Sequence, residues 1–253
     1  MQNPFDLSGR RALVTGGGSG LGFAIARALA EAGARVIING RDRARLESAA
    51  ATLAADGLAV ETAPFDVTQT SAVAASIVAL EGEAPIDILV NNAAVNRRGS
   101  LEGFGDDDWR ALMAANLDAP FFVARALIPG MKARRRGKII NVCSLASDIG
   151  RPNIVPYATS KGGLRMFTRA LAVELASFNI QVNGIAPGFF RTAMNAPLMK
   201  DLEFSAWVER RTPAGRWGEP PEIGGAAVFL ASSAADYVTG HLLAVDGGFG
   251  AAY

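Results

Sequence analysis

Three residues in the middle of the chain have the types and spacing of a proton-transfer site. Lys161 lies four positions after Tyr157, and Ser144 lies thirteen positions before it. A free phenol has a pKa near ~10, so it is a poor base at neutral pH unless a nearby cation favours its phenolate. Lys161 could be that cation, because residues four apart share one face of a helix. Such a site would interconvert an alcohol and a carbonyl.

The segments around these residues predict where they lie in a fold. Apolar residues recur at helical spacing from 162 to 176, and residues 138–144 have the pattern of a strand that ends at Ser144. Open α/β sheets bind their ligands at the carboxyl ends of such strands. A Tyr-x-x-x-Lys pair alone is weak evidence, because ordinary helices often carry an exposed tyrosine beside a solvated lysine.

A glycine-rich loop near the N-terminus lies between an expected strand and an expected helix. Residues 11–15 are typical of a buried strand, and an amphipathic helix is expected from 23 to about 32. Glycines let the backbone approach a pyrophosphate, and a helix N-terminus offers free N–H groups to it. The spacing Gly16-x-x-x-Gly20-x-Gly22 is neither the usual Rossmann pattern nor a Walker loop. A simple tight turn is the alternative interpretation.

Short motifs continue along the rest of the chain. They are Thr15-Gly16-x-x-x-Gly20-x-Gly22, Asp66-Val67, Asn91-Asn92-Ala93, Asn116, Ser144, Tyr157-x-x-x-Lys161, Pro187-Gly188 and Val245-Asp246-Gly247-Gly248. In order and spacing they resemble the short-chain dehydrogenase/reductase family, and the resemblance covers essentially the whole chain. It implies an NAD(P)-dependent oxidoreductase acting on a secondary alcohol and its ketone.

The resemblance also implies a role for each motif residue. Tyr157 would be the general acid–base, Lys161 would lower its pKa and hold the nicotinamide ribose, and Ser144 would hydrogen-bond the substrate oxygen. Asn116 would be the fourth catalytic residue and would support a water relay to the lysine. The family usually has glycine at position 94, so the methyl group of Ala94 is expected to crowd the coenzyme slightly. The implied coenzyme contacts are Gly16, Ser19, Gly20, Leu21, Gly22, Arg41, Asp66, Val67, Asn92, Ala93, Tyr157, Lys161, Pro187, Gly188, Phe190 and Thr192.

The residue about twenty positions beyond the glycine loop selects between the two coenzymes. Gly40 occupies the place of the acidic residue of NAD-preferring enzymes, and Arg41 follows it. Arg41 could therefore hold a 2′-phosphate with charge-assisted hydrogen bonds. A shift of register would instead make Asp42 the ribose ligand of an NAD enzyme, and Ser19 stands where many NADP enzymes have a second basic residue. NADP is predicted, with NAD as the alternative.

Strands and helices alternate along the chain. Strands are expected near 11–15, 35–39, 59–64, 86–91, 137–144, 181–186 and 241–245. This alternation predicts an α/β fold with a Rossmann-like, doubly wound parallel sheet of about seven strands. No repeat or linker interrupts the chain, so residues 1–253 are predicted to form a single dinucleotide-binding domain. By resemblance, residues 188–220 would be its substrate lid.

The composition limits the partners and the location of the protein. The net charge of +1 gives no electrostatic attraction to nucleic acid or membranes, and the basic run 132–136 is expected to be a solvated helix end. The single cysteine, Cys143, excludes an intrachain disulfide and is expected to pack behind Ser144. We expect no metal site. The N-terminus lacks a signal pattern and no uninterrupted apolar run reaches ~18 residues, which predicts a cytoplasmic protein without a membrane segment.

Within the family, the chain is most similar to dehydrogenases of sugar acids. The similarity lies in the Arg97-Arg98 loop, the Arg151-Pro152 turn and the run 211–218. It implies interconversion of D-gluconate and 5-keto-D-gluconate, with Arg98 or Arg151 holding the carboxylate, although either could equally be a surface arginine. A neutral polyol, a ketose or another carbonyl compound is the alternative substrate. The resemblance also implies a homotetramer.

Two other functional classes are compatible with parts of the sequence. His241, the only histidine, could act as a base for Ser144 in a serine hydrolase. However, the Gly-x-Ser-x-Gly elbow of many hydrolases is absent around Ser144. A coenzyme-sensing binding protein would share the fold, but it would not need the four predicted catalytic residues together. Their joint presence favours an enzyme.

Overall fold

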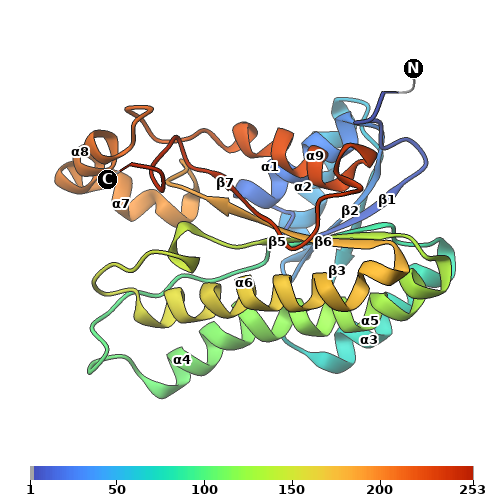
Figure 1. Ribbon diagram of the computed structural model, residues 1–253, viewed down its shortest axis with the longest axis horizontal. Coiled ribbons are helices and arrows are strands. Elements are labelled where there is room, and N and C mark those ends of the chain that lie inside the picture. Colours follow the sequence, from blue (N-terminus) through green and yellow to red (C-terminus); the bar gives the residue numbers. More distant parts are fainter. Residues whose placement is uncertain (1–2, 253) are drawn as a thin grey trace.

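The computed structural model describes residues 3–252 and contains a seven-stranded parallel sheet with helices on both faces (Figure 1). The sheet order is β3-β2-β1-β4-β5-β6-β7, and every neighbouring pair is parallel. The strands are β1 (Arg11–Thr15), β2 (Arg35–Gly40), β3 (Val60–Pro64), β4 (Ile88–Asn91), β5 (Gly137–Val142), β6 (Ile180–Pro187) and β7 (Leu242–Val245). The predicted α/β fold with about seven strands is confirmed. Met1, Gln2 and Tyr253 of the predicted single domain lie outside the described residues.

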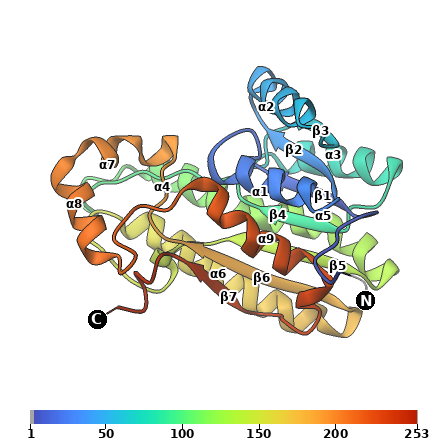
Figure 2. The same ribbon diagram turned by 90° about the horizontal axis from the view of Figure 1, so that it is seen from above.

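Helices on the two faces bury the sheet in two hydrophobic cores. One face is covered by α1 (Gly20–Glu31), α2 (Arg43–Ala55) and α9 (Gly224–Ala231), which lie nearer the viewer in Figure 2. The other is covered by α3 (Thr70–Glu83), α5 (Ala119–Arg134) and α6 (Val155–Leu175), with α4 (Asp106–Met113) leading into α5. Central strands therefore need apolar side chains toward both faces, which explains their nearly continuous apolar sequences.

The sheet order reverses direction between β1 and β4, which are neighbours although they are not consecutive in sequence. Such a switch point leaves a crevice outside the carboxyl ends of the strands, where doubly wound sheets bind ligands. Helices α7 (Ala196–Lys200) and α8 (Leu202–Arg211) lie beyond the same ends (Figure 2). Residues 188–220 thus stand over the crevice.

Helix α6 extends from Val155 through the periodic run 162–176 and includes both Tyr157 and Lys161, as their predicted helical pairing requires. Pro156 in its first turn has the φ angle that a helix start requires. Tyr157 consequently lies in the first turn of α6.

Two element boundaries near the motifs differ from the prediction. Helix α1 begins at Gly20 rather than 23, and β5 ends at Val142, two residues before Ser144. Hydrophobic periodicity located these elements but did not detect their caps.

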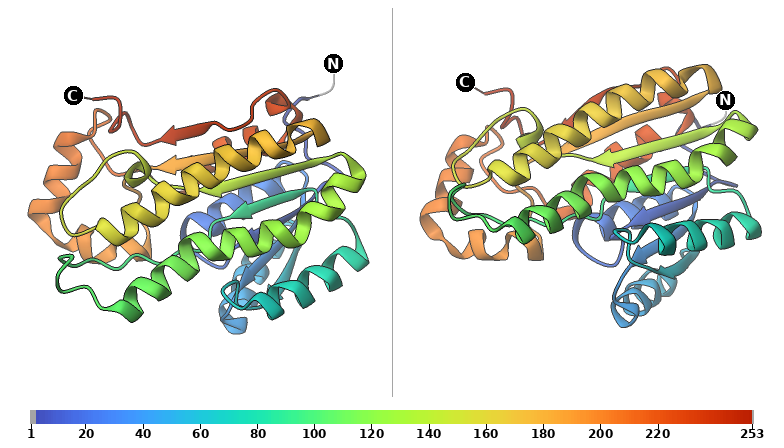
Figure 3. Two further views of the ribbon diagram at one scale, coloured as in Figure 1. Left: turned by 60° about the horizontal axis from the view of Figure 1, so that its bottom comes forward. Right: turned by 90° about the horizontal axis from the view of Figure 1, so that it is seen from below.

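Residues 106–134 form one bent helical run. A π-helical turn, Ala114–Asp118, joins α4 to α5 and places Asn116 at the bend. By length and composition alone, this run is apolar enough to cross a membrane, and it is the one such helix among the described residues. In the structure α4 and α5 pack against α6 and α3, respectively (Figure 3). This packing favours a helix of the α/β layers over a membrane span.

The sequence suggested that the basic run 132–136 is a solvated helix end, but two of its arginines form ion pairs with acidic residues. Arg134 pairs with Glu81 at 3.1 Å, and Arg136 pairs with Asp87 at 2.6 Å. Asp87 is buried just before β4, so these pairs lie at the amino-terminal edge of the sheet. The basic run therefore stabilises the end of the sheet that is opposite to the crevice.

Candidate active site

A cavity of about 930 Å³ occupies the crevice at the carboxyl ends of the strands. This volume lies within the range of small-molecule and cofactor sites. Every coenzyme contact and both substrate arginines predicted from the sequence line the cavity, as do Ser144, Tyr157 and Lys161. Ala94 lines it too. Asn116 is the exception, because it is fully buried behind the wall.

The glycine loop packs too tightly for side chains at its junction with α1. A Cβ atom at Gly22 would lie 2.3 Å from the backbone oxygen of Gly16. Ser19 is the N-cap of α1, but its side chain makes no capping hydrogen bond. The first N–H groups of a helix have no partner within the helix, so this end of α1 is suited to bind an anion such as a pyrophosphate.

The residues that follow β2 line the part of the cavity expected to hold the adenosine, and they decide between NAD and NADP. Gly40 is the last residue of β2, and the Asp42 carboxylate caps α2 by accepting a hydrogen bond from the Arg45 amide at 3.1 Å. This engagement disfavours Asp42 as a ribose ligand. Arg41 is exposed and lies 3.9 Å from the Asp66 carboxylate, a surface pair that contributes little energy. Arg45 also lines the cavity, one helical turn beyond Arg41. Its four-residue spacing from Arg41 was a usable sequence signal that we missed.

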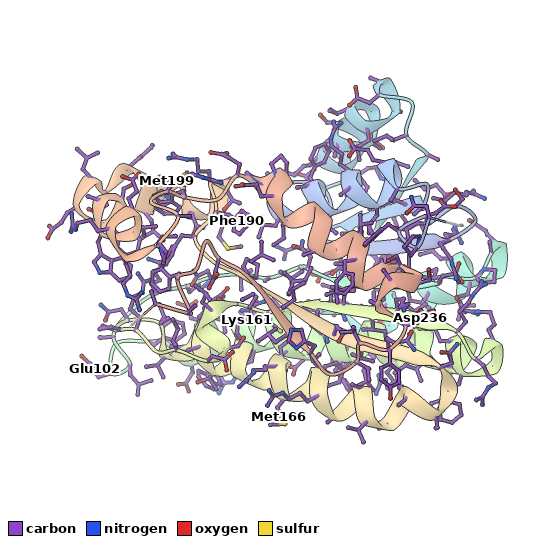
Figure 4. The ribbon with its side chains drawn as sticks, turned by 45° about the horizontal axis from the view of Figure 1, so that its top comes forward. Glu102, Lys161, Met166, Phe190, Met199 and Asp236 are labelled. Atoms are coloured by element: carbon purple, nitrogen blue, oxygen red, sulfur yellow. The ribbon has the colours of Figure 1, made fainter. Side chains whose placement is uncertain are left out.

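The structure brings together the three residues of the predicted proton-transfer site. Lys161 is 3% exposed, and its Nζ donates to the Val142 carbonyl oxygen at 2.7 Å. The same nitrogen lies 5.9 Å from the centroid of the Tyr157 ring. Figure 4 shows Lys161 in the interior of the molecule, whereas Met166 on the same helix points outward. The Ser144 Oγ accepts a hydrogen bond from the Ala146 amide at 3.1 Å.

Burial dominates the protonation of this group. The surrounding protein raises the pKa of Tyr157, while the hydrogen bond to Ser144 and the charge of Arg98 lower it in part. Burial lowers the pKa of Lys161 to about 8. The Lys161 ammonium group donates to the Val142 carbonyl oxygen, and the lowering of the phenol pKa by Lys161 stays a prediction. Arg98 is a second cation near the phenol, and its charge lowers the phenol pKa in part.

Asn116 connects two walls of the cavity rather than facing into it. Its Oδ1 accepts from the Val95 amide at 2.8 Å, and its Nδ2 donates to the Val95 oxygen at 2.9 Å. Nδ2 also lies 3.1 Å from the Ser160 Oγ, which in turn donates to the Tyr157 carbonyl at 2.7 Å. These bonds fix the loop after β4 relative to the first turn of α6.

Arg98 and Arg151 form a cationic wall of the cavity. Their guanidinium carbons lie 6.0 and 4.9 Å from the Phe204 ring centroid, and that of Arg151 lies 5.9 Å from the Phe189 centroid. Partial burial removes water from both guanidinium groups and lowers their pKa. The charge of Arg98 lowers the pKa of Arg151 further. Within residues 3–252, neither forms an ion pair with a carboxylate. An anionic ligand would balance these charges.

Several cavity residues lay outside the sequence prediction. Asn96, Trp207, Arg211 and Phe249 all line the cavity. Trp207 and Arg211 belong to the predicted lid 188–220, but neither was singled out individually. Phe249 follows β7, and no local pattern connects it with this cavity.

The remaining candidate residues do not add a second chemistry. Cys143 is buried, as predicted for a packing residue, although it also lines the cavity. His241 stands at the start of β7, whereas Ser144 follows the end of the parallel strand β5. In the register of the sheet His241 lies beside Asn183, which is level with Ile140 in the middle of β5, and it does not line the cavity that contains Ser144. This placement disfavours the serine hydrolase interpretation. No group of three or more His, Cys, Asp or Glu that could hold a metal occurs in the described part of the chain.

Comparisons with known proteins agree with this geometry. A family model described as enoyl-(acyl carrier protein) reductase matches residues 16–250. Gluconate 5-dehydrogenase of Gluconobacter oxydans (strain 621H) is 48% identical over 245 residues, covering 96% of each chain. The 5-keto-D-gluconate 5-reductase of Escherichia coli (strain K12) is 47% identical over 249 residues, covering 98% of each. The crystal structure of a gluconate 5-dehydrogenase from Burkholderia cenocepacia J2315, in complex with NADP and tartrate, is 49% identical with a TM-score of 0.96, covering 99% of this chain and 98% of that one.

Proposed function

Because this chain belongs to the short-chain dehydrogenase/reductase family, we propose that it interconverts D-gluconate and 5-keto-D-gluconate with NADP(H). The single observation that carries the substrate proposal is the pair of guanidinium groups, Arg98 and Arg151, without carboxylate partners in the cavity that contains Tyr157. A sugar acid supplies the missing negative charge. The relatives named above support the same substrate class.

Residues suited to each part of NADP line the cavity. The helix start at Gly20 would receive the pyrophosphate, and Arg41 with Arg45 would hold the 2′-phosphate. Lys161, Asn92 and Pro187 would contact the nicotinamide half, as the family resemblance implies. The neighbour from Burkholderia cenocepacia, crystallised with NADP, supports this choice of coenzyme.

Three side chains would perform the chemistry. A bound coenzyme would accept a hydride from the substrate carbon as NADP⁺ during alcohol oxidation and would donate one to it as NADPH during ketone reduction. During alcohol oxidation the Tyr157 phenolate takes the hydroxyl proton, and during ketone reduction the phenol returns it. The Ser144 hydroxyl would hold the substrate oxygen and stabilise its developing negative charge where water is excluded. Lys161 would bind the ribose hydroxyls and keep positive charge near the phenolate.

Arg41→Ala should weaken NADP binding far more than NAD binding. Loss of charged hydrogen bonds to the 2′-phosphate costs about 1.5–3 kcal/mol, and NAD lacks that phosphate. Arg45→Ala should act in the same direction, whereas Arg43→Ala serves as a matched control, because Arg43 pairs with Glu47 outside the cavity. Fluorescence titration with both coenzymes measures the dissociation constants. Equal losses for NAD and NADP would contradict the proposed phosphate site.

The decisive substrate comparison is kcat/KM for 5-keto-D-gluconate against the uncharged ketose D-fructose. An arginine site should discriminate strongly against the neutral molecule, because its buried charges then remain unpaired. Arg151→Ala should lower kcat/KM for the sugar acid by about 10–100-fold, with little change for fructose. Arg98→Ala should lower kcat/KM for both substrates, and more for the sugar acid, because the charge of Arg98 also acts on the Tyr157 phenol. A coenzyme-linked absorbance assay measures both substrates.

Arg110→Ala is the control for this comparison, since Arg110 is an exposed arginine paired with acidic residues on α4. If the wild-type enzyme used fructose as well as the sugar acid, the gluconate proposal would be wrong. The oxidoreductase assignment would then remain, with a neutral polyol or ketose as substrate. Binding of NADP without turnover of any sugar acid, polyol or ketone would favour a coenzyme-sensing protein.

We further propose that residues 188–220 are the substrate lid and that the protein is a cytoplasmic homotetramer. The outer faces of α4, α5 and α6 carry exposed apolar side chains, among them Trp109, Phe121, Met166 and Val173, and Met166 points away from the cavity in Figure 4. Burying such a surface against another copy would be favourable. A sedimentation-equilibrium mass of one chain would contradict the tetramer.

A further inference from the structure

The segment 246–252, which we call the post-β7 turn, packs against the end of α8. Arg211 is the last residue of α8, and its Nη1 and Nη2 donate to the carbonyl oxygens of Phe249 at 3.3 Å and Ala252 at 2.9 Å. Its guanidinium carbon also lies 4.8 Å from the centroid of the Phe249 ring. Figure 1 shows this dark red end of the chain beside the orange α8. The Arg211 side chain therefore holds the post-β7 turn through two hydrogen bonds to carbonyl oxygens and one contact with the Phe249 ring.

The other side of the post-β7 turn is fixed by its own Asp246 carboxylate and by Gly188, the first residue of the proposed lid. The Asp246 carboxylate accepts hydrogen bonds from the amides of Gly248 at 2.9 Å and Gly250 at 2.7 Å. A Cβ atom at Gly188 would lie 2.7 Å from the Cα atom of Asp246, so the two backbones are in close contact. The turn is thus held between Gly188, at the proposed nicotinamide site, and α8.

Phe249 brings the turn into the cavity wall. It is buried, with ring centroids 5.3 Å from Phe189 and 5.8 Å from Trp207, and all three residues line the cavity. Arg151 contacts the same Phe189 ring. The aromatic wall to which Phe249 belongs therefore adjoins the arginines proposed to bind the substrate carboxylate.

We propose that Arg211 is a positioning residue for the substrate site and that Phe249 limits the size of the substrate. Arg211 holds the post-β7 turn so that Phe249 closes the end of the cavity beside Phe189. A guanidinium group presents its donors in a planar fork, which suits two carbonyls at once, whereas an ammonium group is a point donor. This inference rests on the proposed function only in assigning that end of the cavity to the substrate.

The test compares Arg211→Ala, Arg211→Lys and Phe249→Ala with the control Arg210→Ala, a substitution at the exposed neighbour on α8. Steady-state kinetics use whichever ketone the wild-type enzyme reduces, and fluorescence titration gives the NADP dissociation constant. Arg211→Ala should raise KM about tenfold or more, with kcat changed less and NADP binding unchanged. Arg211→Lys should recover part of the loss. Phe249→Ala should raise KM similarly and improve the relative kcat/KM for bulkier ketones.

A second measurement does not depend on substrate identity. Hydrogen exchange at the amides of residues 247–252 should accelerate in Arg211→Ala and remain normal in Arg210→Ala. Because Arg211 and Phe249 act through one turn, the double substitution should raise KM little more than Phe249→Ala alone. Unchanged exchange and KM in Arg211→Ala, or an equal loss of NADP affinity, would overturn the inference. Failure of the wild type to use gluconate would count only against the proposed function.

Discussion

Tyr157→Phe should lower kcat by about 10²–10⁴-fold, the usual effect of losing a positioned acid–base group. The phenylalanine ring keeps the packing of the first turn of α6 but cannot accept or donate the substrate proton. Coenzyme binding should persist, because the glycine loop, Arg41 and Lys161 remain in place. A coenzyme-linked assay in both directions measures turnover, and fluorescence titration measures NADP affinity.

Tyr237→Phe is the matched control, since Tyr237 is fully exposed and does not line the cavity. It should leave kcat unchanged. Turnover by Tyr157→Phe within a few-fold of the wild type would remove Tyr157 from the mechanism. If NADP affinity is lost as well, circular dichroism distinguishes a damaged fold from the loss of a coenzyme contact by the Tyr157 hydroxyl.

Lys161→Met should nearly abolish activity and yet stabilise the protein at pH 7. Activity should fall by at least about 10²-fold, because the cation near Tyr157 and the ribose is lost. The pKa of Lys161 is lowered from 10.5 to about 8 by burial, so the charged lysine costs the folded state about 3 kcal/mol at pH 7. Losing the hydrogen bond to Val142 offsets part of this gain. We expect a net increase of about 1–2 kcal/mol in the free energy of unfolding.

The pH dependence of the free energy of unfolding shows whether Lys161→Met stabilises the protein by removing a buried charge or by improving the packing. Below pH 8 Lys161 is protonated in both states, and the full cost of burying its charge is present. Between about 8 and 10.5 the unfolded chain binds the proton that the folded protein has released, so wild-type stability rises with pH relative to the variant. Denaturant unfolding should show the variant more stable at pH 7, and this difference in the free energy of unfolding should vanish or change sign at pH 10. A constant difference would contradict the pKa assignment.

The sequence by itself determined the fold class and the residues that could perform chemistry. Central strands such as β1, β2 and β4 were located because buried parallel strands are almost continuously apolar, and that pattern is local. Tyr157 and Lys161 were recognisable as a pair because four residues make about one helical turn. The glycine loop was recognisable because only glycine permits the close backbone approach seen at Gly22. Each of these signals lies within one element or one connection.

Only the tertiary structure decided how these residues act on one another. It directed Lys161 at the Val142 carbonyl, placed Asn116 behind the cavity wall, and brought the charge of Arg98 close enough to act on the phenol. It also brought Phe249 and Arg211 to the proposed substrate site from separate segments. Charge, burial and pKa depend on every segment that meets at a site. Periodicity along one segment carries no information about its distant neighbours, so these properties could be determined only once the chain had folded.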